Sequence, residues 1–141
     1  MLTRRHTLAL LAAAAAPLPV RAASDGMLSY SPGMAESRLA AGETVLLDFW
    51  ASWCATCAAQ DRAIHALCEE KPAYTDAITF IQVDWDEYRT AEVTRRLNIP
   101  RRSTLVLLHG EAELGRIVAG TRKSRIGALL DKGLGTDDTA S

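Results

Sequence analysis

The sequence lacks several features that would place it in other protein classes. It has only three cysteines among 141 residues, and aromatic residues make up 6%. The length leaves no room for a second sizeable core, so one domain is expected. We find no internal repeat. The hydrophobic and charged shares, 48% and 23%, are ordinary for a globular protein and argue against disorder.

An excess of positive charge is also missing. The whole chain carries a net charge of −1, and without residues 1–22 it keeps 13 basic and 17 acidic residues, a net charge of −4. Nucleic-acid-binding domains and polybasic membrane segments need the opposite balance. We therefore expect no nucleic-acid partner and no electrostatic membrane attachment.

No apolar run reaches the roughly 20 residues that a membrane span needs. The run Leu8–Ala16 is shorter, follows the basic residues Arg4 and Arg5, and precedes the small-residue pattern Val20–Ala22. This order is typical of a bacterial secretory signal. Residues 1–22 are therefore predicted to be a signal peptide whose removal leaves a periplasmic protein with no stable membrane insertion. The general secretory route and the twin-arginine route both fit.

Apolar strands and helical patterns alternate along residues 23–134, the predicted domain. Strands are expected at 45–50, 78–83, 104–108 and 114–118. Helices are expected at 32–41, from just after Trp53 to Lys71, at 90–97, and over a last segment capped by Ser124 and ending near Gly133. This order predicts an α/β domain of three layers, α/β/α, with a central mixed sheet. Residues 135–141 are predicted to be a flexible tail.

Two cysteines, Cys54 and Cys57, lie where the first buried strand passes into a helix. Two intervening residues let both sulfurs reach one helical turn and bond reversibly. At the helix start, unpaired N–H groups and the helix dipole favour an anion, which lowers the thiol pKa of Cys54. Cys54 is therefore the predicted nucleophile and Cys57 the resolving thiol. Because the cysteine count is odd in an oxidising compartment, a purely structural disulfide framework is not expected.

A carboxylate, Asp48, interrupts the same buried strand six residues before Cys54. Keeping it charged among apolar neighbours is costly, so its pKa is expected to be raised. From below the cysteine pair, Asp48 would relay the proton that Cys57 loses or gains.

The segment Asp48–Cys57, with its Trp50, Trp53 and the intervening Ala55 and Thr56, resembles the active site of the thioredoxin family. Together with Val83-Asp84-Trp85 it is also similar to periplasmic thioredoxin-like proteins and to the C-terminal domain of the thiol transporter DsbD. The resemblance implies a thioredoxin fold, the roles given above for both cysteines and Asp48, two tryptophans packed around the site, and no cofactor beyond the reversible disulfide.

The chain departs from that pattern at Ser103, just before the strand that begins at Thr104. The family places a cis-proline there, facing the cysteines. A cis bond without proline costs about 3 kcal/mol, so a trans bond between Arg102 and Ser103 is expected, with a reshaped substrate-binding edge. Gln82 stands where many relatives carry a lysine, which leaves Asp48 easier to protonate. Arg101 and Arg102 lie either beside the sulfurs or in solvent.

These features favour an exported, monomeric thiol–disulfide oxidoreductase that reduces protein disulfides. No histidine separates the cysteines, which argues against a strongly oxidising pair, and a reductant in an oxidising compartment needs an electron donor. The resemblance suggests a membrane thiol carrier of the DsbD or CcdA type. Cytochrome c biogenesis, disulfide repair and a peroxidase are possible destinations for the electrons.

Two other functions stay open. The pair Cys54 and Cys57 could bind copper(I), or zinc with further ligands, although Cys68 lies about 16 Å along the helix from Cys57, too far for a shared ion. Cys68 is more simply a small core residue. A static disulfide in a non-catalytic binding module is the other alternative.

Overall fold

The computed structural model describes residues 26–136. The predicted signal peptide and residues 137–141 of the predicted tail lie outside this range. Residues 135 and 136 of the predicted tail are described: Thr136 is buried, and its hydroxyl lies 2.9 Å from that of Thr44. Among the described residues, no helix is long and apolar enough to cross a membrane.

Within residues 26–136, five strands form one mixed sheet in the order β1-β3-β2-β4-β5. β3 runs parallel to β1 and β2, whereas β4 is antiparallel to β2 and β5. Strand β2 is therefore central. The strands are β1 (Met27–Ser29), β2 (Thr44–Trp50), β3 (Ile78–Asp84), β4 (Thr104–His109) and β5 (Ala112–Val118).

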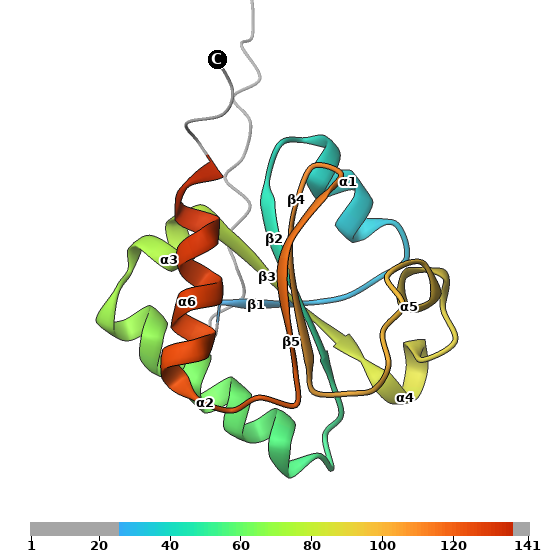
Figure 1. The fold of residues 1–141 in the computed structure, drawn as a ribbon. Helices are drawn as coiled ribbons and strands as arrows, with labels where there is room; N and C mark the ends of the chain where they lie inside the picture. The colour runs from blue at the N-terminus through green and yellow to red at the C-terminus, as the bar shows by residue number, and fades with distance from the viewer. Residues whose placement is uncertain (1–25, 137–141) are drawn as a thin grey trace, which may run out of the picture.

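Helices cover both faces of the sheet (Figure 1). One side carries α2 (Ala55–Glu70), α3 (Ala73–Ala77) and α6 (Lys123–Leu134). The other carries α1 (Met34–Ala40), α4 (Trp85–Tyr88) and α5 (Glu92–Arg96). The prediction of three α/β/α layers with a central mixed sheet is confirmed.

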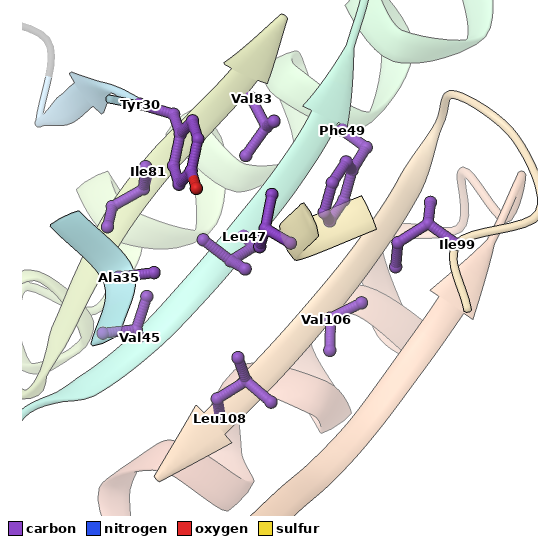
Figure 2. Packing of buried hydrophobic residues seen from close by; sticks show 11 residues of the cluster. Tyr30, Ala35, Val45, Leu47, Phe49, Ile81, Val83, Ile99, Val106 and Leu108 are labelled. Carbon is purple, nitrogen blue, oxygen red and sulfur yellow. The ribbon is translucent and has the colours of Figure 1, made fainter. Parts of the chain in front are cut away.

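Alternating side chains of the central strands fill two separate cores. Val45, Leu47 and Phe49 of β2 face the helices α1, α4 and α5, where they meet alternate residues of β3 and β4 (Figure 2). Leu46 points to the opposite face, toward residues of α2, α3 and α6. A near-continuous apolar run suits β2 because both of its faces are covered. Asp48, two residues after Leu46, faces the α2 side.

Short elements are where the predictions fall short. β1, α3 and α4 were not predicted, and the helix expected at 90–97 is reduced to α5. The prediction that Ser124 caps the last helix is wrong: α6 begins at Lys123, and its N-cap is Arg122, two residues before Ser124, without a side-chain cap. Single turns and three-residue strands carry too few positions for a periodic pattern, so docking on the sheet decides where they form.

Candidate functional site

The cysteine pair lies at the junction of β2 and α2. Cys54 is the N-cap of α2, and the backbone N–H of Cys57 donates a hydrogen bond to the Cys54 sulfur at 3.2 Å. The two sulfurs are bonded to each other, and the Cα atoms are 5.3 Å apart. Cys54 is 5% exposed and Cys57 2%. The predicted placement of Cys54 at the helix start, among unpaired N–H groups, is thus found in the structure.

Ser103 packs directly against the sulfurs. Its hydroxyl lies 3.2 Å from the Cys54 sulfur and 3.0 Å from the Cys57 sulfur. The peptide bond from Arg102 is trans, as predicted, and Ser103 adopts a φ of 61°. The next residue, Thr104, is fully buried and donates its hydroxyl to the Arg101 carbonyl at 2.7 Å.

Gln60, which was not predicted as a site residue, supports this segment from helix α2. Its side chain is fully buried, and the amide Nε2 donates to the carbonyls of Ser103 and Gly120, each at 3.0 Å. A signal was present: Gln60 lies one helical turn before the buried Ile64, so it is a polar residue on the apolar stripe of the helix.

Asp48 is 1% exposed on the α2 side of β2. Burial raises the pKa of its carboxyl from 3.8 to about 7, and the charge of Asp61 adds to the rise. Neither carboxyl oxygen of Asp48 has a hydrogen bond of good geometry to a described residue. The Gln82 amide lowers the Asp48 pKa, but by less than burial raises it. The expected pKa shift is therefore present.

Asp61 is a second carboxylate of the site that sequence reasoning missed. It lies one turn after Cys57 on α2, and its Oδ1 is buried without a hydrogen-bond partner among the described residues. Its Oδ2 lies 3.7 Å from His65 Nδ1. Asp61 also lines a cleft of about 110 Å³ shared with Cys54, Cys57 and Gln82. The cleft therefore extends from the two cysteines to Gln82, which pairs with Asp48 between strands β3 and β2.

Three tryptophan side chains form the rim of the site, defined here as Trp50, Trp53 and Trp85. Trp50 packs against the cysteines, and so does Trp85, which was not predicted to be at the site. Trp53 is 59% exposed; its indole N–H donates to Asp86 at 2.9 Å, and the Arg102 guanidinium lies 4.3 Å from its ring centroid.

The remaining predicted neighbours lie in the first turn of α2 and in the loop before β4. Ala55 is exposed, and Thr56 is half-buried in the first turn of α2. Arg101 is exposed and donates to the Arg102 carbonyl at 3.2 Å. The arginine that joins the rim is thus Arg102, through the indole of Trp53.

The third cysteine stands apart from the pair. Cys68 is half-buried near the end of α2, packs against the core of that face, and its thiol pKa is raised by burial. Within residues 26–136, no three His, Cys, Asp or Glu side chains are grouped as metal ligands. A larger hollow of about 520 Å³ lies near Leu39 and Leu97. It contains no cysteine, so we place the site at the smaller cleft.

Comparison with known proteins points to one family. The family model described as Thioredoxin matches residues 33–132. Thioredoxin H-type from Oryza sativa subsp. indica is 32% identical over 95 residues, covering 67% of this chain and 72% of that protein. Thioredoxin H2 from Arabidopsis thaliana is 31% identical over 88 residues, and the match spans 61% of its length and 62% of this chain.

Solved structures give the same result. The crystal structure of Trxlp from Edwardsiella tarda EIB202 has a TM-score of 0.65 at 27% identity and covers 74% of this chain and 97% of that one. Thioredoxin from Schistosoma mansoni has a TM-score of 0.60 at 26% identity, with coverage of 77% and 95%.

Proposed function

Because the chain belongs to the thioredoxin family and has its fold, we propose that it is a thiol–disulfide oxidoreductase that reduces protein disulfides through Cys54 and Cys57. One observation carries the proposal: a bonded cysteine pair stands at the start of a 16-residue helix, with Cys54 as its N-cap, and the strand before it holds a buried carboxyl of raised pKa. Such a pair can open and close without a bound cofactor.

In the proposed reaction, the Cys54 thiolate attacks one sulfur of a substrate disulfide, forming a mixed disulfide and releasing the other substrate sulfur as a thiolate. Cys57 then loses its proton and attacks the Cys54 sulfur. The Cys54–Cys57 bond forms, the second substrate thiolate leaves, and two electrons have passed to the substrate.

Asp48 is the proposed acceptor of the Cys57 proton. Its pKa of about 7 leaves it partly ionised at neutral pH, which is the state a base needs. The cleft lined by Cys57 and by Gln82, the β3 partner of Asp48, would let water reach this part of the site. When the pair is reduced again, Asp48 would return the proton.

The proposal extends to where the protein acts. The pattern of residues 1–22 supports export to the periplasm, where we propose that the protein acts as a monomer. The absence of histidine between the cysteines supports a reducing role. A membrane thiol carrier of the DsbD or CcdA type would then supply electrons, with cytochrome c biogenesis as one pathway that could use them.

Trapping of partners tests the proposal. In a Cys68→Ser background, Cys57→Ser should accumulate mixed disulfides with exported proteins, because the resolving thiol is gone. The control is the same protein with Cys54→Ser added, which should give none. Adducts absent from the first variant, or equally abundant in the control, would contradict exchange through Cys54.

Metal analysis separates this function from copper(I) or zinc binding. We expect the reduced protein to be purified metal-free, with two titratable thiols at the site. A stoichiometric metal ion that is lost in Cys54→Ser would instead favour the metal-binding alternative.

A further inference from the structure

Ser103 is held in place from several directions. Its N–H donates to the Phe49 carbonyl at 2.7 Å. Its carbonyl accepts from the Ala119 N–H at 2.8 Å and from the Gln60 amide at 3.0 Å. A φ of 61° is unfavourable for a residue with a Cβ, and it persists only where the surroundings enforce it. The position of the Ser103 side chain is therefore set by the fold.

The enforced position brings the hydroxyl of Ser103 to both reactive sulfurs, at 3.2 Å and 3.0 Å. Neither sulfur of a disulfide carries a hydrogen, so the hydroxyl is the donor in this state. Ser103 is fully buried, and water cannot compete for its hydrogen. A hydroxyl has one hydrogen and rotates about its C–O bond, so it can serve either sulfur without moving a heavy atom.

We propose that Ser103 is a two-position hydrogen-bond donor that stabilises whichever sulfur of the pair carries the negative charge. The inference rests on the proposed function and adds a residue to its mechanism. In the reduced protein the hydroxyl donates to the Cys54 thiolate, beside the N–H of Cys57. Once Cys54 is bonded to substrate, the Ser103 hydroxyl rotates and donates to the Cys57 thiolate. The hydroxyl keeps its proton throughout, so the electron and proton balance of the exchange is unchanged.

Stabilising a thiolate favours the reduced protein, and hydrogen bonds to charged acceptors are stronger than those to neutral ones. Removing the hydroxyl should therefore raise the Cys54 thiol pKa. It should also shift the equilibrium with glutathione toward the protein disulfide, making the protein a stronger reductant. A hydroxyl that only fills space would affect neither quantity.

The test uses Ser103→Ala and Ser103→Gly in the Cys68→Ser background. Both remove the hydroxyl, and glycine also accepts the positive φ, so it keeps the fold if alanine does not. We expect the Cys54 pKa, followed by thiolate ultraviolet absorbance, to rise by about one unit in both variants. The glutathione equilibrium should shift about threefold to tenfold. Ser37→Ala, an exposed hydroxyl on α1, is the matched control and should change neither.

Asp48 also titrates at the site, and Asp61 lines the same cleft as the two cysteines, so each variant is compared with its parent over the same pH range. An unchanged Cys54 pKa in the folded glycine variant would overturn the inference. Neither measurement needs a protein substrate. If trapping finds no partners but the Cys54 pKa shifts, the proposed function fails and the role of Ser103 stands. If partners are trapped but the Cys54 pKa is unchanged, the proposed function stands and the role of Ser103 fails.

Discussion

The two halves of strand β2 lie in different surroundings. Val45, Leu46 and Leu47 lie in cores made of apolar groups. On the α2 side beyond them lies a buried polar layer, defined here as Asp48, Gln60, Ser103 and Thr104, each at most 1% exposed. Apolar burial is non-directional, whereas a buried polar group depends on its partners and its ionisation. The two regions should therefore respond differently to pH and to substitution.

The largest expected effect comes from replacing Asp48, the titrating group of the polar layer. Unfolded Asp48 loses its proton near pH 4, whereas the folded protein keeps it up to about pH 7, so the free energy of unfolding falls as the pH rises between these values. In Asp48→Asn this loss is absent. The stability of the variant relative to the parent should grow by about 4 kcal/mol between about pH 4 and pH 8.

Urea unfolding of the oxidised proteins across that pH range measures this difference. The exposed Asp76→Asn is the control and should follow the parent. Parallel curves for Asp48→Asn and the parent would show that Asp48 titrates normally in the folded state.

In the apolar region, Leu107→Ala should cost about 3 kcal/mol of unfolding free energy because it leaves a cavity in a fully buried core. Unlike the effect at Asp48, this loss should be the same at each pH. Urea unfolding measures it, with the exposed Val118→Ala as control. A pH-dependent loss would mean that the two regions are coupled.

Gln60→Leu tests how the polar layer is held together. The change removes two hydrogen bonds to backbone carbonyls, one buried and one partly buried, and we expect a loss of about 1–2 kcal/mol in unfolding free energy. Because Ser103 loses one restraint, the Cys54 pKa should also move, by less than in Ser103→Ala. Unfolding and thiolate titration measure the two effects. Glu69→Leu, exposed on the same helix, should leave the Cys54 pKa unchanged.

The smallest expected effect is that of Asp61→Asn. Its charge helps to raise the Asp48 pKa, so its removal should lower that pKa by about a few tenths of a unit. The pH-dependent loss of stability would then end at a slightly lower pH and be slightly smaller, while its onset near pH 4 would stay where it is. The same urea series detects the shift, with the exposed Glu69→Gln as control. A shift to higher pH would contradict the repulsion between the two carboxyls.

Much of the apolar region could be predicted from the sequence. The run before Asp48 has the composition of a strand covered on both faces, and the stripe containing Ile64 correctly identifies the buried side of α2. The positions of Cys54 and Cys57 could also be predicted, because a strand-to-helix junction places two cysteines separated by two residues on one turn. These features depend on local periodicity.

The polar layer could be predicted only in part. Asp48 stands out because a charge interrupts an apolar run, but the contacts of Gln60 and Asp61 depend on which loops fold back over α2. Ser103 could be identified as a departure from the family pattern, yet its positive φ could not be predicted. That conformation arises from hydrogen bonds to Phe49 and Ala119, which are distant in sequence.

The hydrogen bond from the Ser103 N–H to the Phe49 carbonyl adds one rung to the ladder between β2 and β4. Proline has no N–H, and its ring holds φ near −65°, so neither the rung nor the backbone conformation at this position is open to it. A single codon change to proline would therefore conflict with the backbone present here. Placing proline at position 103 would therefore need compensating changes in the adjoining loops.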